Sequence, residues 1–143
     1  MPAVEDIMTP DPCCVEPDTP LGEVVRLMKE RQCRQLPVCT SEGKLVGIVT
    51  DRDVRLAMNS PFVLHERADD IALMEDIPAE ACMTPDPLTV DADAPAALAA
   101  DMLREYKFGA LPVVRGQQVV GIVTVSDVLR SYIELTRRLE EIE

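Results

Sequence analysis

The chain has 143 residues, a formal net charge of −12 and 47% hydrophobic residues. This length and apolar content suit one compact domain or two small fused halves. The negative charge repels a phosphate backbone, and a chain without Trp and with only two Phe and two Tyr offers no stacking platform for bases. We therefore expect no nucleic-acid partner.

The cysteines and the N-terminus indicate where the protein works. The cysteines are odd in number, no C-x-x-C pair occurs and His65 is the only histidine, so we expect neither a disulfide framework nor a metal site. The longest apolar runs are too short to span a bilayer, and the N-terminus has no basic region followed by an apolar one. We expect a cytoplasmic protein with reduced thiols and no membrane contact.

The predicted elements of the first half begin after "MTPDP" at 8–12. The segment 19–31 predicts an amphipathic helix with Thr19 as N-cap and Pro20 at its first position, because apolar residues recur at i, i+3, i+4 and i+7 from Leu21. "LPVCTSEGKLVGIVT" at 36–50 predicts two short strands around a turn containing Gly43, followed by a helix from near Asp51.

The second half repeats this order after an acidic, patternless segment at 59–77, which we interpret as a linker. A helix is expected over 94–106, two strands over 111–124 and a last helix from Val125, with 134–143 as its charged continuation. "MTPDP" returns at 83–87 and "LPV" at 111–113, both at an offset of 75, and "GIVT-x-x-D" returns at an offset of 74 after one deletion in the turn.

The repeat divides the chain into a first repeat at 1–58, the linker at 59–77, a second repeat at 78–133 and a C-terminal helical tail at 134–143. Each half would contain a sheet of two or three strands and two helices, which buries too little surface to be stable alone. We expect an α+β fold in which the halves pack as a pseudo-twofold pair.

The repeated T-x-x-D has two interpretations. Thr50 with Asp53, and Thr124 with Asp127, match a capping box that only stabilises a helix start. A hydroxyl and a carboxylate at a helix N-terminus, behind a glycine that permits close approach, also suit a ribose phosphate. The aspartate would accept hydrogen bonds from ribose hydroxyls, as acidic residues do in other nucleotide sites.

The order helix, "LPV", turn, strand and "GIVT-x-x-D", twice in tandem after "MTPDP", resembles a pair of cystathionine-β-synthase (CBS) domains. The resemblance covers nearly everything except the linker and tail. It implies two βαββα units, and two clefts that hold adenosine-containing ligands such as AMP, ADP, ATP, S-adenosylmethionine or NAD. It also implies that each cleft combines the T-x-x-D of one repeat with residues of the other.

Carried over residue by residue, the resemblance gives two sets. The first cleft would use Thr50, Arg52 and Asp53 with Met83, Thr84, Leu88, Phe108, Gly109 and Ala110. The second would use Thr124, Ser126 and Asp127 with Met8, Thr9, Cys13, Cys33, Arg34 and Gln35. Each set contains one arginine, so both clefts are expected to tolerate a phosphate, with unequal affinities. Lys107 and Arg130 add charge nearby or are ordinary surface cations.

Other candidate sites have weaker signals. Cys13 and Cys14 either sense oxidants or metals or are buried structural cysteines, and the acidic linker lacks EF-hand spacing. The sequence contains no Walker motif and no nucleophile, base and orienting set, so we expect no enzyme and no required cofactor.

We therefore expect a stand-alone CBS pair, a homodimer with its four repeats in a flat disc, that senses adenine nucleotides and signals to an effector protein in trans. The alternative is a structural or interaction module with empty clefts. An enzyme that uses the bound nucleotide has no support from the residues. The sequence does not decide which adenosyl ligand binds or whether magnesium accompanies it.

Overall fold

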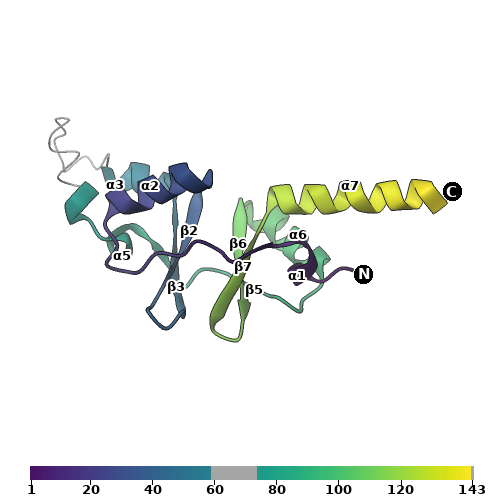
Figure 1. Ribbon diagram of the computed structural model, residues 1–143, viewed down its shortest axis with the longest axis horizontal. Coiled ribbons are helices and arrows are strands. Elements are labelled where there is room, and N and C mark those ends of the chain that lie inside the picture. Colours follow the sequence, from purple (N-terminus) through teal and green to yellow (C-terminus); the bar gives the residue numbers. More distant parts are fainter. Residues whose placement is uncertain (59–73, 143) are drawn as a thin grey trace. The chain divides into compact units, whose positions relative to one another are not determined.

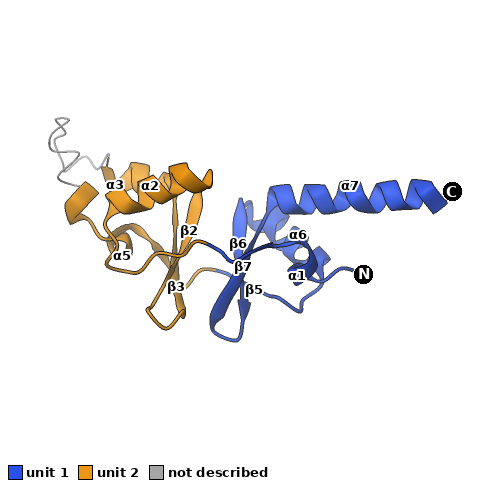
Figure 2. Cartoon of the chain, in the orientation of Figure 1, with its two compact units in different colours: residues 1–12, 88–143 blue, residues 13–87 orange. Residues whose placement is uncertain are grey.

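The computed structural model describes residues 1–58 and 74–142, and it divides the chain into two compact units (Figure 2). Unit 1 comprises Met1–Pro12 and Leu88–Glu143, and unit 2 comprises Cys13–Pro87. The units therefore do not coincide with the consecutive repeats, because the first twelve residues belong with the second half of the chain.

Unit 2 is built on a three-stranded sheet of order β2-β3-β4 (Figure 1). β2 and β3 form the antiparallel hairpin around Gly43, which has a positive φ of 86°. β4 adds to the far side of β3, and Val15 forms a parallel bridge with Val38 on the free side of β2. The elements of this unit are α2 (Leu21–Arg31), β2 (Gln35–Cys39), β3 (Leu45–Thr50), α3 (Asp51–Met58), α5 (Ala79–Cys82) and β4 (Thr84–Pro85).

Unit 1 repeats this plan with a sheet of order β1-β7-β6-β5. β6 and β7 form the antiparallel hairpin, β5 lies parallel to β6 and β1 antiparallel to β7. The last helix runs unbroken to Ile142, so the charged segment from 134 forms its final turns. The elements are α1 (Val4–Ile7), β1 (Thr9–Pro10), β5 (Val90–Asp91), α6 (Ala96–Tyr106), β6 (Ala110–Arg115), β7 (Gln118–Thr124) and α7 (Val125–Ile142).

The two repeats exchange their entry segments, which are the short helix and strand that open each repeat: α1 and β1 in the first, α5 and β4 in the second. β1 comes from the first repeat and pairs with β7 of the second, with Thr9 opposite Ile122. β4 comes from the second repeat and pairs with β3 of the first, with Thr84 opposite Ile48. Each sheet is therefore completed by the other repeat.

Each unit has its own apolar core under its sheet. In unit 1, Val4 of α1 packs with Leu111 of β6, Val123 of β7 and Leu103 of α6. In unit 2, Leu21 and Val24 of α2 pack with Leu36 and Val49 of the hairpin. The alternation of buried and half-buried residues along β3 and β7 directs one face of each sheet to the core.

The predicted α+β class with two repeats is confirmed, but the predicted start of the first helix is wrong by one residue. Pro20, in an extended conformation at ψ 148°, is the N-cap of α2, and Leu21 is its first residue. The hydroxyl of Thr19 accepts a hydrogen bond from the N–H of Glu16 instead of capping the helix. The N–H of Leu21 donates to the carbonyl of Ile77, the last residue of the predicted linker, so a distant part of the chain satisfies this helix end.

Gly47 and Gly121 sit where the exchanged segments approach the sheets. A Cβ on Gly121 would lie 2.8 Å from the carbonyl oxygen of Thr9, and one on Gly47 would lie 3.0 Å from that of Thr84. Both would also collide with a methionine, Met8 or Met83. We expect Gly121→Ala to lower the free energy of unfolding by about 1–3 kcal/mol, because backbone must shift.

Urea denaturation without ligand measures this effect. Gly109→Ala is the matched control, since no heavy atom lies within 4 Å of a Cβ built there. Equal stability of the Gly121→Ala and Gly109→Ala variants would show that the entry segment is not packed as described.

Candidate functional site

Both T-x-x-D motifs form complete capping boxes. The N–H of Thr50 donates to Oδ2 of Asp53 at 3.0 Å, and the N–H of Asp53 donates to Oγ1 of Thr50 at 3.1 Å. Thr124 and Asp127 repeat these bonds at 2.9 and 3.1 Å at the start of α7. The structural interpretation of the motif is thus realised in both copies.

Asp127 has further partners. Its carboxylate accepts a hydrogen bond from Nη2 of Arg130 at 2.7 Å and bonds at 3.3 and 3.4 Å from the hydroxyl of Thr9. Its side chain is only 3% exposed, whereas that of Arg130 is 57% exposed. The guanidinium also donates to the carbonyl of Ile7 at 3.4 Å. These contacts join α7 to the exchanged segment α1–β1, all within unit 1.

Asp53 has a simpler environment and is half-buried. Among the described residues, Thr50 supplies its hydrogen bond and no ion pair holds it. The position equivalent to Arg130 is Leu56, which is 63% exposed. Arg55, one residue earlier, pairs with Asp51 at 3.8 Å. The two carboxylates therefore differ in burial and in charge compensation.

The exchange of entry segments brings several predicted site residues together. Met8 and Thr9 lie against β7 beside Thr124 and Asp127 in unit 1. Met83 and Thr84 lie against β3, the strand that ends at Thr50, in unit 2. The sulfur atoms of Met8 and Met83 occupy the space in front of Gly121 and Gly47. The atoms that approach these glycines closely therefore belong to the protein itself, to a methionine and to the backbone of the next residue.

The other predicted residues belong to the opposite unit from the motif to which they were assigned. Leu88, Phe108, Gly109 and Ala110 are part of unit 1, whereas Cys13, Cys33, Arg34 and Gln35 are part of unit 2. A cleft that combines them with that motif is therefore a proposal. Arg52 and Ser126 both lie at the exposed first turns of α3 and α7.

Backbone contacts place some of these residues beside their own repeat's motif as well. The carbonyl of Arg34 accepts from the N–H of Asp51 at 2.8 Å, and that of Gly109 accepts from Val125 at 3.2 Å. These carbonyls satisfy the first N–H groups of α3 and α7. Sequence reasoning missed this contact, although the similar distance from "LPV" to T-x-x-D in the two repeats, 14 and 13 residues, indicated a common hairpin.

Phe108 also makes a contact that the sequence did not indicate. Its ring stacks on that of Tyr106, with centroids 5.7 Å apart and an angle of 18° between the rings. Tyr106 is 51% exposed and Phe108 is 42% exposed. Lys107 between them has a left-handed backbone that ends α6. The segment thus presents an aromatic pair at the surface of unit 1.

The cysteines in unit 2 are free thiols. Burial raises the pKa of Cys33, and a hydrogen bond with Cys39 together with burial raises the pKa of Cys14. Thiols with raised pKa values stay protonated at neutral pH and react slowly. The raised pKa of Cys14 argues against oxidant sensing there, but Cys14 is exposed and Cys13 half-buried, so neither is the buried structural cysteine of the alternative.

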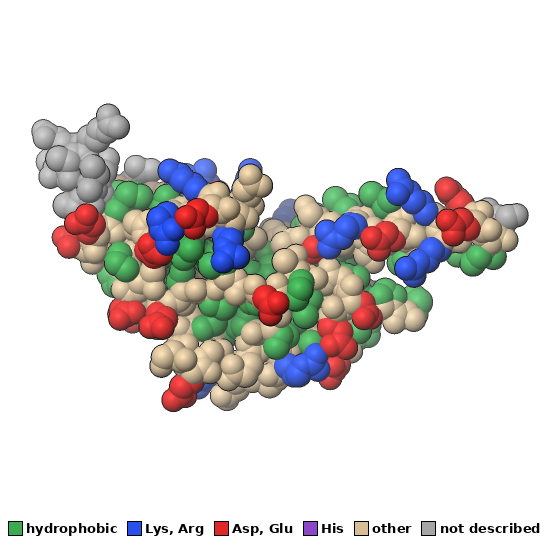
Figure 3. Space-filling view, in the orientation of Figure 1, with side chains coloured by type: hydrophobic (Ala, Val, Ile, Leu, Met, Phe, Trp, Pro, Cys, Tyr) green, Lys and Arg blue, Asp and Glu red, His purple; other side chains and the backbone are tan. Residues whose placement is uncertain are grey.

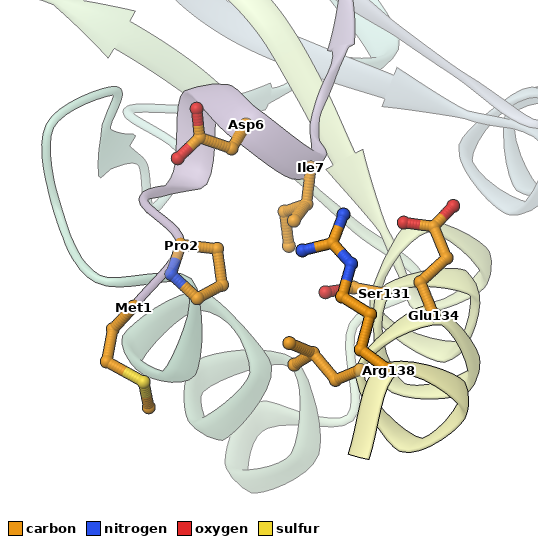
Figure 4. A pocket seen from close by; sticks show the side chains of 8 residues that line it. Met1, Pro2, Asp6, Ile7, Ser131, Glu134 and Arg138 are labelled. Atoms are coloured by element: carbon orange, nitrogen blue, oxygen red, sulfur yellow. The ribbon is translucent and has the colours of Figure 1, made fainter. Parts of the chain in front are cut away.

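Two surface grooves lie within single units. One of about 410 Å³ in unit 1 runs between α1 and α7, with Pro2, Asp6 and Ile7 on one wall and Glu134 and Arg138 on the other (Figure 4). The other, of about 270 Å³, lies between α2 and α3 and includes Cys33. Neither groove includes Asp53 or Asp127, so neither is the predicted nucleotide site.

The described residues hold no group of three or more His, Cys, Asp or Glu side chains placed to bind a metal ion. The same part of the chain contains no helix long and apolar enough to cross a membrane. α7, the longest helix, carries acidic and basic side chains among its apolar ones (Figure 3).

The model of the CBS domain family matches residues 4–60 and 75–134. The chain belongs to the CBS domain family. The two matches cover both repeats, and the resemblance seen in the T-x-x-D motifs is confirmed. A CBS domain-containing protein of Dictyostelium discoideum is 32% identical over 88% of this chain and 88% of its own length.

Solved structures of CBS pairs resemble the chain closely. CBSX2 from Arabidopsis thaliana, solved in complex with AMP, is 31% identical with a TM-score of 0.79 and covers 94% of this chain and 98% of its own. The CBS domain pair of protein MJ0100, in complex with 5′-methylthioadenosine and S-adenosyl-L-methionine, is 27% identical with a TM-score of 0.73. This match covers 92% of this chain and 96% of the MJ0100 chain.

Some curated relatives are much longer than the CBS pair. The chain spans 24% of the inosine-5′-monophosphate dehydrogenase of Aquifex aeolicus and 32% of an uncharacterized protein of Methanocaldococcus jannaschii. The enzyme matches align only to their CBS portion, so they assign no catalytic activity to this chain.

Proposed function

We propose that this CBS pair is a regulatory module that binds adenosine-containing nucleotides at its two T-x-x-D sites. The observation that carries the proposal is the duplicated carboxylate at the N-terminus of α3 and α7, each beside an exchanged entry segment. A helix N-terminus attracts the negative charge of a phosphate. The AMP and S-adenosyl-L-methionine complexes of similar CBS pairs support an adenosine ligand.

In this proposal Asp53 and Asp127 accept hydrogen bonds from ribose hydroxyls, and Thr50 and Thr124 contact ribose or phosphate. Apolar residues from the opposite repeat flank the adenine: Met83, Leu88, Phe108 and Ala110 at the first site, and Met8, Cys13 and Cys33 at the second. Arg52 and Arg34 each bring one cation to a different site. The ligand belongs to the AMP, ADP and ATP class.

The module is proposed to work as a homodimer and to pass its signal to an effector protein. A ligand shifts a conformational equilibrium only by its difference in affinity for the two conformations. Signalling therefore requires a nucleotide that binds one arrangement of the chain better than another. No catalytic step is assigned to the described residues.

The complete capping boxes favour a second candidate, a structural or interaction module. Thr50 and Thr124 already use their hydroxyls on the backbone of their own helix. A motif that serves only as a cap stabilises each helix start by about 1 kcal/mol and needs no ligand. Ligand binding separates the two candidates.

Thermal unfolding with AMP, ADP, ATP with and without Mg²⁺, NADH and S-adenosylmethionine tests the proposal. A ligand that binds only the folded state stabilises it by about 2.7 kcal/mol at a hundredfold excess over Kd, so the unfolding temperature rises. Asp53→Asn and Asp127→Asn should each reduce the shift, whereas Asp101→Asn, on the exposed face of α6, should keep it.

The protein must first be shown free of carried-over nucleotide by its ultraviolet spectrum after denaturation and filtration. No shift with any of these ligands would then leave the capping box as the function of the motif. An undiminished shift in the Asp53→Asn, Asp127→Asn double variant would place the nucleotide elsewhere.

A further inference from the structure

The two T-x-x-D sites differ at one residue that touches the aspartate. In the second repeat Arg130 lies one helical turn after Asp127 and bonds to its carboxylate at 2.7 Å. In the first repeat the same position is Leu56, which has no charge to offer Asp53. The sequence alone left Arg130 as either a site residue or a surface cation, and the structure shows an exposed side chain that bonds to Asp127.

The carboxylate of Asp127 is nearly saturated with donors. It accepts from the N–H of Thr124, the hydroxyl of Thr9 and the guanidinium of Arg130. A carboxylate has about four acceptor positions, and this one is 3% exposed. A ribose that reaches Asp127 must therefore lie against Arg130 and cover part of its charged head.

Arg130 is already paired with Asp127, so the two side chains together carry no net charge, whereas Asp53 has no ion-pair partner among the described residues. A phosphate is therefore repelled less at Asp127 than at Asp53. Arg130 uses Nη2 on Asp127 and on the carbonyl of Ile7, which leaves its other N–H groups for a ligand. A phosphate can accept hydrogen bonds from these groups. An uncharged 5′ group accepts no such charged hydrogen bond.

The Asp53 carboxylate has no such arginine bonded to it. Among the described residues no guanidinium is held at Asp53, and the nearest ion pair, between Arg55 and Asp51, lies on the exposed side of α3. Arg52 is adjacent to Asp53 in the chain, and neighbouring residues of a helix point in different directions. An uncharged adenosyl ligand can therefore reach this carboxylate without covering a paired cation.

We infer that Arg130 makes the Asp127 site select adenosine ligands with a negatively charged 5′ group, while the Asp53 site also accepts uncharged ones. The inference rests on the proposed function, since it assigns ligand classes to the same two sites.

Isothermal titration with AMP and with 5′-methylthioadenosine, which has no charged 5′ group, tests this assignment. Asp53→Asn leaves the Asp127 site to be measured, and Asp127→Asn leaves the Asp53 site. The preference for AMP is the Kd for 5′-methylthioadenosine divided by the Kd for AMP. We expect this ratio to be at least about tenfold larger at the Asp127 site than at the Asp53 site, because a charged hydrogen bond contributes roughly that factor or more.

The repeat itself supplies the matched exchange of residues. Arg130→Leu in the Asp53→Asn background should reduce the preference for AMP to that of the other site. Leu56→Arg in the Asp127→Asn background should give the Asp53 site the stronger preference for AMP. If Arg130→Leu does not fold, Arg130→Gln and the Leu56→Arg variant carry the test, since Leu56 is exposed and an arginine fits there.

The outcomes are distinct for the two proposals. The role of Arg130 is overturned if the preference for AMP is equal at both sites and Arg130→Leu does not change it. The proposed function stands in that case if the Asp53→Asn, Asp127→Asn double variant still loses binding. Absence of binding by either ligand to the wild-type protein overturns both. A preference that follows the arginine from one site to the other supports the inference.

Discussion

Val4→Asp is expected to unfold unit 1, whose other elements come from residues 88–143, and to leave the hairpin of its own repeat folded. Val4 is fully buried in the core formed by α6, β6 and β7. Its N–H donates to the carbonyl of Ala94 at 2.8 Å, and the next N–H donates to Ala92 at 3.0 Å. A carboxylate there has no partner, and the cost, about 4 kcal/mol or more, is comparable with the stability of a small domain.

Hydrogen exchange read by mass spectrometry locates the damage. Protection should fall first in residues 96–124 and persist in residues 35–50. The mirror variant is Ala79→Asp, since Ala79 is fully buried in unit 2 at the equivalent position. It should reverse the pattern, and Glu80→Ala, exposed on the same helix, should change little. Loss of protection in 35–50 with protection kept in 96–124 would contradict the exchange of entry segments, whereas equal loss in both ranges would show that the two units unfold together.

Leu111→Ala is expected to lower the free energy of unfolding by about 2–5 kcal/mol. Leu111 is 1% exposed, lies opposite Val123 in the hairpin and packs under α6. Truncation leaves a cavity that the paired strands cannot close, because their register is fixed by hydrogen bonds. Leu36→Ala should have a similar cost in unit 2, where Leu36 occupies the equivalent position.

Chemical denaturation measures these values, and Leu98→Ala is the control. Leu98 is 47% exposed on α6, so its truncation should change the stability by less than about 0.5 kcal/mol. A cost for Leu111→Ala no larger than that of Leu98→Ala would mean that the core of unit 1 lies elsewhere.

Periodicity and repetition predicted the hairpins and the long helices. The alternation in "GIVT" and the position of Gly43 defined β2 and β3, and the duplicated motif placed the starts of α3 and α7 at Asp51 and Val125. The short elements α1, α5, β1 and β4 were not predicted, because two to four residues carry no periodic signal. Only the resemblance to CBS domains indicated that the entry segments exchange.

The T-x-x-D sites were predicted as residue types, and the contacts that distinguish them were not. Thr9 and Arg130 meet at Asp127 because the exchanged strand and the first turns of α7 converge there, which depends on tertiary packing. The start of α2 shows the same limit. Its first N–H bonds to Ile77, more than fifty residues away, so the local cap signal of Thr19 gave way to a long-range partner.

The exchange of entry segments is reciprocal, since β1 pairs with β7 and β4 pairs with β3 in the same antiparallel sense. A chain containing one repeat would have an unpaired strand edge and a detached entry segment that fits that edge. Two identical copies of such a chain can satisfy each other by swapping these segments with twofold symmetry. Joining the copies end to end then gives the present connectivity without any strand changing its neighbours. The tandem chain is in this sense a covalently linked domain-swapped dimer.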